Sequence, residues 1–216
     1  MGISQMLMKL AEGMATSCWI FGITLLFSLP LGMVIAFGRM SKKRIVQGIT
    51  KIYISIMRGT PLMLQLMVVY FGPYYLFGIK ISPFYRNIAV VIGFVLNYAA
   101  YFAEIYRSGI ESMPVGQYEA AEILGYSKSQ TFLHIILPQV IKRILPSVTN
   151  EVITLVKDTS LAFVIAVSEM FTIAKALESS QTSMVPYVAA GIFYYVFNFL
   201  VAWIMEKIEK HLSYYR

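Results

Sequence analysis

The feature of this sequence that most constrains its fold is a series of long apolar segments separated by short basic clusters. A helix that crosses a bilayer needs about 20 mainly apolar residues. The segments that approach this length are the predicted spans: 15–38, 49–77, 87–110, 140–158 and 187–205. Backbone in lipid must satisfy its own hydrogen bonds, so segments of this length are expected to be helices. The sequence therefore predicts an all-α integral membrane protein with about five transmembrane helices.

The composition agrees with lipid as the solvent. Of 216 residues, 58% are hydrophobic and 13% are charged, whereas soluble domains carry about 25% charged residues. The length suits one domain covering residues 1–216. A single cysteine, Cys18, excludes an intrachain disulfide and a thiolate cluster. The two histidines, His134 and His211, lie too far apart in the predicted layout for a shared metal ion, so no metal site is predicted.

The basic residues indicate how the chain is oriented. They cluster after the first span, around the start of the fourth and after the last, as Arg39, Lys42, Lys43, Arg44, Lys128, Lys142, Arg143, Lys207, Lys210 and Arg216. Lys and Arg concentrate on the cytoplasmic side of membrane proteins. This places the N-terminus outside, and the segment 112–138 and the C-terminus in the cytoplasm. The net charge of +7 then reflects topology and not nucleic-acid binding. Residues 1–12 lack the pattern of a cleaved signal and are expected to lead into the first span.

Two predicted spans are interrupted. The residues 58–61 break the second span, and 157–160 break the fourth before a short apolar run, 161–167, that is expected to be re-entrant. Pro61 has no N–H, so the carbonyl of Met57 loses its helical donor. That carbonyl is expected either to receive the ammonium or guanidinium group of a substrate or to meet water or a neighbouring hydroxyl.

Polar residues form a stripe on each of two predicted spans. Asn97, Tyr101 and Glu104 follow one another at helical spacing, and Glu151 and Asp158 do the same on the fourth span. Ionisable groups inside a membrane are costly and tend to face an interior path. The predicted substrate-binding groups are therefore Asn97, Tyr101, Glu104, Glu151, Asp158, Thr159, Ser160 and the Met57 carbonyl. For Glu104 an ion pair with Arg107 is the structural alternative.

The predicted cytoplasmic segment, about 112–138, has the pattern of two short helices. Gly125 suits the left-handed residue that ends a helix. Ser127 and Gln130 have the spacing of a capping box that starts the next helix. Pro138 is expected to break that helix before the fourth span. The segment should form a compact projection on the inner face of the membrane.

The same segment resembles the signature loop of ABC-importer permeases, in which Glu-Ala-Ala is followed by Gly and then Ile-x-Leu-Pro. The matching residues are Glu119, Ala120, Ala121, Gly125, Ile135, Leu137 and Pro138. The segments 58–61 and 157–161 also resemble those of the polar amino acid permeases. The resemblance implies a type I importer permease in which Glu119, Ala120, Ala121 and Gly125 belong to a coupling helix that docks on an ATPase.

The resemblance also implies the partners. These are two copies of an ABC ATPase, a second permease subunit, an extracytoplasmic solute-binding protein and an amino acid, in a bacterial cytoplasmic membrane. No phosphate-binding loop of the Gly-x-x-x-x-Gly-Lys-Ser/Thr type is present. The chain is therefore expected to be a transport subunit and not an enzyme. It should bind no cofactor itself, with ATP and Mg on the partner ATPase.

The substrate is expected to be a polar amino acid. Counted along the sequence, Glu104, Glu151 and Asp158 outnumber Arg58 and Lys157, so arginine, lysine or histidine is favoured, because a carboxylate offsets the desolvation of a cation. A glutamine- or glutamate-type substrate is the alternative. An ion-coupled secondary transporter is the rival class, since buried acids can relay protons, although the internal repeat common in that class is missing.

Overall fold

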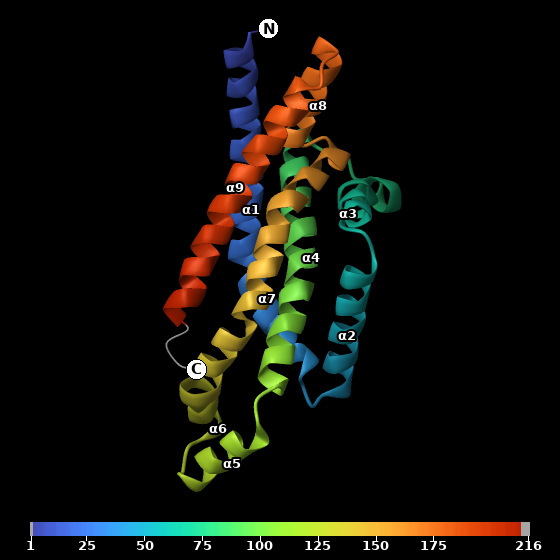
Figure 1. The fold of residues 1–216 in the computed structure, drawn as a ribbon. Helices are drawn as coiled ribbons and strands as arrows, with labels where there is room; N and C mark the ends of the chain where they lie inside the picture. Colours follow the sequence, from blue (N-terminus) through green and yellow to red (C-terminus); the bar gives the residue numbers. More distant parts are fainter. Residues whose placement is uncertain (1, 213–216) are drawn as a thin grey trace.

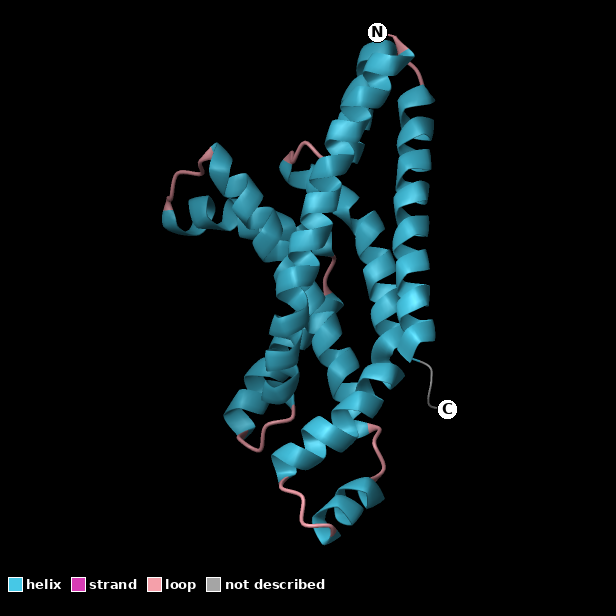
Figure 2. Ribbon diagram, turned by 90° about the vertical axis from the view of Figure 1, so that its left-hand side faces the viewer, coloured by secondary structure: helices cyan, strands magenta, loops and turns pink. Residues whose placement is uncertain are grey.

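The computed structural model describes residues 2–212 of the chain. Met1 and residues 213–216, which include Arg216 of the last basic cluster, lie outside the described residues. Within residues 2–212 every regular element is a helix (Figure 2). The predicted all-α class is therefore confirmed.

Among residues 2–212, three helices are long and apolar enough to cross a membrane, and two bent helix pairs bring the number of candidate spans to five if each pair is one span. This confirms the prediction of about five spans. The long helices are α1 (Ile3–Arg39), α4 (Pro83–Glu111) and α9 (Val185–Leu212). The first bent pair is α2 (Arg44–Gly59) with α3 (Leu62–Phe77). The second joins the helical stretch Lys128–Ile165 to α8 (Met170–Gln181). That stretch comprises α6 (Lys128–Gln130), η1 (Thr131–Ile136), α7 (Leu137–Asp158) and η2 (Thr159–Ile165).

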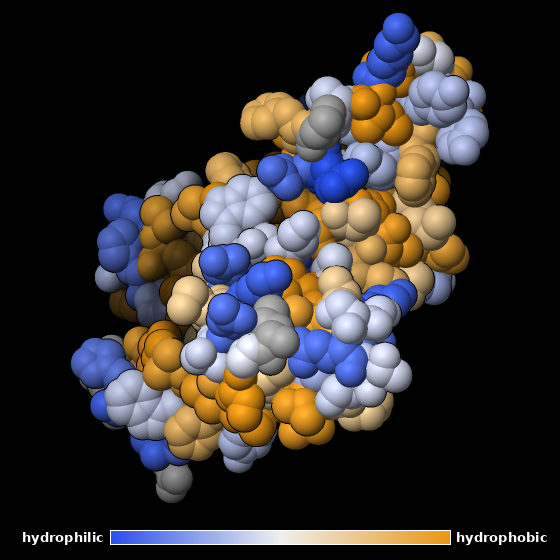
Figure 3. All heavy atoms as spheres, turned by 90° about the horizontal axis from the view of Figure 1, so that it is seen from above, coloured by the Kyte–Doolittle hydropathy of each residue, from blue (hydrophilic) through white to orange (hydrophobic). Residues whose placement is uncertain are grey.

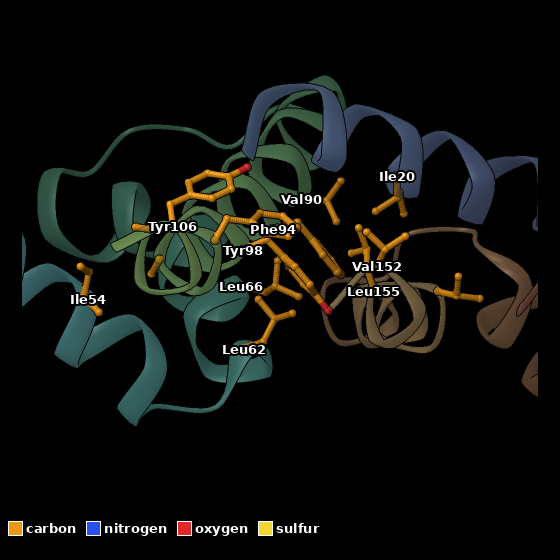
Figure 4. Packing of buried hydrophobic residues seen from close by; sticks show 14 of the residues in the cluster. Ile20, Ile54, Leu62, Leu66, Val90, Phe94, Tyr98, Tyr106, Val152 and Leu155 are labelled. Atoms are coloured by element: carbon orange, nitrogen blue, oxygen red, sulfur yellow. The ribbon is translucent and has the colours of Figure 1, made fainter. Parts of the chain in front are cut away.

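The long elements α1, α4, α7 and α9 run side by side, with the N-terminus and α8 at one end of the molecule (Figure 1). α6 and α5 (Val115–Ile123) lie at the opposite end, as expected for a segment that projects from the membrane. The core between these helices is aromatic and aliphatic. Phe94 and Tyr98 of α4 meet Ile20 of α1 and Leu155 of α7 (Figure 4). These four side chains are at most 2% exposed.

α1 begins twelve residues earlier than the predicted span. Its 37 residues correspond to about 55 Å at 1.5 Å per residue, more than the roughly 30 Å of a hydrocarbon core. Its first turns are held by a small second core in which Met6 and Leu10 pack against Met170, Ala174 and other residues of α8 and α9. The extension is therefore stabilised by tertiary packing that the span-length rule does not include.

The break at Thr60 and Pro61 is larger than an interruption of one span. α2 and α3 meet at 111°, and both residues have extended backbone. In Figure 1 α3 accordingly points across the direction of α2. Pro61 forces a break here because it cannot donate to Met57 and because proline disfavours a helical residue before it. The segment 49–77 is thus two helices.

The second break lies after Asp158. Most of the apolar run 161–167 lies in the 3-10 helix η2, which ends at Ile165 and is followed by Ala166 with a positive φ of 56°. α8 then begins, bent by 59° from the preceding stretch. No helix was predicted at 170–181, although Met170, Ala174 and Leu177 have helical spacing and are buried. The carboxylate of Glu169 accepts the backbone N–H groups of Phe171 and Thr172 at 2.6 and 2.7 Å and so caps this helix.

The projecting segment confirms most of its predicted local structure. Gly125 has a φ of +80°, and Ser127 and Gln130 form a capping box. The expected break at Pro138 is wrong, because helical backbone continues through η1 into α7. η1 is a π-helix, and Pro138 lies in the first turn of α7 that follows it. A π-helical turn changes the register of the backbone hydrogen bonds. The changed register accommodates Pro138, which has no N–H to donate.

Candidate functional site

A polar cavity of about 320 Å³ lies between α2, α4 and α7, in the half of the molecule nearer α5 and α6. Polar and charged side chains from all three helices line it. They are Arg58 from α2; Tyr101, Glu104 and Ser108 from α4, with Ser112 directly after it; and Arg143, Ser147 and Glu151 from α7. The cavity thus brings together parts of the two polar stripes expected from the sequence.

The α4 side of the cavity follows from helical spacing. Tyr101, Glu104 and Ser108 are three and four residues apart and therefore share one face. The side of the same helix that faces away from this stripe carries Ala99, Phe102 and Ala103, which are fully buried. The apolar face fixes the rotation of α4, and this fixes the direction of its polar stripe.

One of the cavity's charges, Glu104, has a strong intrahelical partner. The guanidinium of Arg107 forms ion pairs with the carboxylates of Glu104 and Glu111. The ion pair that was the structural alternative for Glu104 is therefore present. Glu104 still lines the cavity, but Arg107 offsets its negative charge.

The charged groups of Arg58 and Glu151 remain open to a ligand. The guanidinium carbon of Arg58 lies 5.4 Å from the centre of the Tyr101 ring, a cation–π contact. Among residues 2–212, no carboxylate forms an ion pair with Arg58 and no basic side chain pairs with Glu151. Besides Arg143, whose guanidinium donates to the Ser112 carbonyl at 3.1 Å, the cavity therefore offers one guanidinium and one carboxylate from different helices.

Asp158 does not line this cavity. Its carboxylate accepts a hydrogen bond from the hydroxyl of Tyr98 at 2.8 Å. Tyr98 is 2% exposed, so the pair joins α4 to the end of α7 inside the core. The two following residues also use their side chains locally. The Thr159 hydroxyl donates to the Val156 carbonyl, and the Ser160 hydroxyl to that of Lys157.

The Met57 carbonyl, exposed by Pro61, is occupied by two side-chain amides. Gln65 donates to it at 3.0 Å and Asn97 at 3.1 Å. Asn97 also donates to the Gln65 side-chain oxygen at 2.9 Å. Neither expectation for Met57 included an amide, and the network uses Asn97 away from the cavity lining. A buried polar group needs such partners because an unmet hydrogen bond costs about 1–3 kcal/mol.

The residues of the signature loop lie at the tip of the molecule opposite the N-terminus (Figure 1). Glu119, Ala120 and Gly125 are exposed, whereas Ala121 is 1% exposed and packs inward. Beside them Ile123 and Leu124 are 87% and 73% exposed. Apolar side chains this exposed at a polar end of a membrane protein indicate contact with another protein.

Gln65 and Tyr98 are the functional neighbours that the sequence analysis missed. Gln65 is a single amide in a strongly apolar helix, four residues after a proline, and this position could have indicated a backbone partner. Nothing comparable distinguishes Tyr98 from the other tyrosines of the chain. In the part of the chain that the structure describes, no group of three or more potential metal ligands occurs.

Comparison with known proteins gives one consistent result. The family described as binding-protein-dependent transport system inner membrane component matches residues 28–214. The L-cystine transport system permease protein TcyL of Bacillus subtilis (strain 168) is 38% identical, over 98% of this chain and 90% of its own length. The arginine transport system permease protein ArtQ of the same organism is 36% identical, over 94% and 91%.

Two further matches extend this result. A putative glutamine transport system permease protein GlnP of Rickettsia bellii (strain RML369-C) is 35% identical, over 97% of this chain and 95% of its own length. A crystal structure of an amino acid ABC transporter with histidines superposes with a TM-score of 0.85 at 29% identity, covering 94% of each chain.

Proposed function

Since the chain belongs to the family of binding-protein-dependent transport system inner membrane components, and its relatives are amino acid permeases of ABC importers, we propose that it translocates a polar amino acid through the cavity between α2, α4 and α7. The observation that carries this proposal is the pairing of an open guanidinium, Arg58, with an open carboxylate, Glu151, in one lining. A zwitterion presents the complementary charges. Its carboxylate would bind Arg58 bidentately, and its ammonium group would bind Glu151.

The charges of the cavity bear on the substrate class. The excess of acidic over basic residues counted along the sequence is not found in the cavity, because Asp158 lies outside the lining and Arg107 pairs with Glu104. Arg58 and Arg143 stand against Glu104 and Glu151. This balance favours a neutral zwitterion such as glutamine over the cationic amino acids expected first. An arginine-, lysine- or histidine-type substrate remains the second candidate. The carboxylate of Glu104 would then bind the cationic side chain of the substrate.

The site residues therefore divide by proposed role. Tyr101, Glu104 and Glu151 line the substrate path with Arg58. Asn97 and the Met57 carbonyl shape the bend beside it, and Asp158, Thr159 and Ser160 hold the end of α7 in place. Broken helices at membrane depth are a common frame for solute sites. One break directly follows the α2 segment that carries Arg58, and the other follows the end of α7, the helix that carries Glu151.

The energy for transport is proposed to come from a separate ABC ATPase. Glu119, Ala120, Ala121 and Gly125 lie in the exposed tip, and Ile123 and Leu124 beside them supply apolar area for docking. ATP and Mg would bind to that subunit, in two copies for two permease subunits. This chain would bind no cofactor.

The remaining components follow from the same family. We propose that the N-terminus lies outside the bacterial cytoplasmic membrane and that the tip and the C-terminus lie in the cytoplasm. The reason is that the basic residues cluster on the side of the tip and the C-terminus. A second permease subunit would close the path, and an extracytoplasmic solute-binding protein would deliver the amino acid. The two states of alternating access then depend on whether the ATPase pair is closed or open.

Substrate-stimulated ATP hydrolysis tests this proposal. The permease is co-purified with the ATPase encoded beside it, reconstituted with its binding protein and supplied with glutamine, cystine, arginine, lysine or histidine in turn. We expect hydrolysis to rise for a polar amino acid and to rise most for a neutral one. Stimulation by the cationic amino acids alone would favour the second candidate. Hydrolysis that no amino acid changes would contradict the proposed function.

A further inference from the structure

A second polar pocket, of about 510 Å³, lies at the end of the molecule opposite α5 and α6. It is bounded by α1, the first turn of α4 and the residues after η2, with the lining Ala15, Thr16, Trp19, Arg86, Asn87, Val167 and Ser168. The lining contains one cationic side chain, Arg86, together with hydroxyl, amide and indole donors. Among the described residues it contains no carboxylate. Seen from this end, blue hydrophilic patches interrupt a largely orange hydrophobic surface (Figure 3).

Arg86 carries a charge that the described chain does not neutralise. Its Nη1 atom donates to the Ala166 carbonyl at 3.0 Å, and its guanidinium carbon lies 6.0 Å from the centre of the Tyr70 ring. Its Nε atom is buried and has no hydrogen-bond partner in the described part of the chain. Within residues 2–212 no carboxylate pairs with it. A guanidinium has five N–H donors in a planar fork that suits phosphate oxygens, so the pocket is built for an anion.

An apolar groove of about 550 Å³ lies deeper between the same two helices, lined by Phe27, Pro30, Leu31, Val34, Val91, Ile92, Val95 and Leu96. On α1, Thr16 and Trp19 of the pocket share a helical face with Phe27 and Val34 of the groove. The groove begins eight residues below Trp19, or about 12 Å at 1.5 Å per residue. One leaflet of a hydrocarbon core is about 15 Å deep, so an acyl chain anchored at the pocket reaches the groove.

We propose that the pocket and groove together bind an anionic phospholipid from the leaflet that faces away from α5 and α6. The phosphate lies at Arg86, with Thr16, Asn87 and Ser168 as further donors, and one acyl chain lies along the α1–α4 groove. Trp19 is 45% exposed at the pocket, where an indole ring has its usual place between headgroups and acyl chains. The order of the two sites, polar towards the membrane surface and apolar towards its centre, is the order of groups in a phospholipid.

Tryptophan fluorescence can test the proposal, because the chain has only Trp19 and Trp203. In a Trp203→Phe background, the full chain is reconstituted into phosphatidylcholine vesicles with a minor fraction of lipid brominated on its acyl chains. The brominated lipid is either phosphatidylglycerol or phosphatidylcholine. Choline offsets the phosphate charge in phosphatidylcholine but glycerol does not in phosphatidylglycerol, so we expect phosphatidylglycerol to quench Trp19 with about fivefold higher relative affinity, the value of one basic residue beside an anionic lipid.

The variants separate headgroup recognition from general surface charge. Arg86→Gln should abolish the preference, and Lys80→Gln, which removes a cation from the loop before α4 but not from the pocket, should leave it unchanged. Arg86→Gln also removes the hydrogen bond to the Ala166 carbonyl, so Thr16→Asp is used as a second variant. It places a carboxylate in the pocket without altering the Arg86–Ala166 bond and should abolish the preference, whereas the similarly sized Thr16→Asn should retain it.

Three results would overturn the proposal. Equal quenching by both lipids would mean that bulk lipid fills the groove. No quenching by either would mean that protein, such as a second copy of the chain, covers the pocket. Loss of the preference on addition of inorganic phosphate would mean that a free anion occupies the pocket without an acyl chain.

Discussion

The side-chain amide of Gln65 donates a hydrogen bond to the carbonyl oxygen of Met57, at 3.0 Å. Gln65 lies on α3 and Met57 on α2, so this bond spans the 111° bend between the two helices. The same amide nitrogen donates to the Thr60 carbonyl at 3.1 Å. One side chain thus replaces the backbone donor that Pro61 lacks.

Replacing Gln65 by leucine should destabilise the bend. The Met57 carbonyl would keep only Asn97 as its donor, and Asn97 would lose its acceptor on Gln65. We expect a loss of about 1–3 kcal/mol, the cost of buried polar groups left without partners. Thermal unfolding in detergent measures it, with Gln47→Leu on the exposed side of α2 as the matched control. Equal melting temperatures for the two variants would contradict this role of Gln65.

Tyr98 and Asp158 should be energetically coupled. Their hydrogen bond of 2.8 Å joins α4 to the end of α7 in the core. Tyr98→Phe removes the donor, and Asp158→Ala removes the acceptor. A double-mutant cycle from thermal unfolding should give a coupling of about 1–2 kcal/mol. Additive single effects would show that the pair does not stabilise the fold.

Gly13 and Gly22 provide a matched pair on α1. A Cβ atom at Gly13 would lie 2.8 Å from the Cα of Met170, whereas one at Gly22 would meet nothing within 4 Å. The obstacle at Gly13 is backbone and cannot rotate away. We expect Gly13→Ala to cost about 1–3 kcal/mol through overpacking and Gly22→Ala to be neutral or slightly stabilising. A similar loss in both variants, measured by thermal unfolding, would contradict the close contact between α1 and α8.

The exposed tip should bind the ATPase through apolar contact. Ile123 is 87% exposed beside the Glu119–Ala121 segment. Burial of an isoleucine contributes about 1.5–3 kcal/mol, so Ile123→Ser should weaken ATPase binding about tenfold or more. Ile3→Ser, at the opposite end and 72% exposed, is the control. Titration of purified ATPase into the reconstituted permease measures both, and equal affinities would exclude the tip as the docking site.

Glu151 should matter more for uptake than the other acids. It lines the cavity without a basic partner among the described residues, whereas Glu104 is paired with Arg107. We expect Glu151→Gln to lower uptake about tenfold, with Glu178→Gln, a half-buried residue of α8 outside the cavity lining, as the control. Uptake of labelled glutamine and arginine is compared in each variant. If Glu104→Gln and Asp158→Asn lower arginine uptake selectively, the cationic substrate class is favoured instead.

The class of fold and the positions of its breaks were predictable, because both depend on local chemistry. Apolar length gives the spans, and Pro61 interrupts a helix wherever it occurs. The angle at that break was not predictable. It depends on Gln65 and Asn97, which come from two other parts of the chain and meet Met57 only in the folded protein. The same holds for α8, whose buried face needs α1 and α9 as partners.

The site was predictable in part for the same reason. Helical spacing places Tyr101 and Glu104 on one face, and the structure brings that face to Glu151. Asp158 continues the α7 stripe in sequence, yet its carboxylate turns to Tyr98. Spacing fixes which side of a helix a residue occupies, but the tertiary partner decides where its charge points. A count of charges along the chain therefore overstated the acidity of the cavity.

Uptake into vesicles of defined composition tests the central claim most directly. The permease, its ATPase and its binding protein are reconstituted, and labelled amino acid uptake is measured with ATP present and all ion gradients collapsed. We predict that uptake continues under these conditions and stops when ATP or the ATPase is omitted. Uptake that needs an ion gradient and continues without ATP would contradict the assignment of this chain as an importer subunit driven by a partner ATPase.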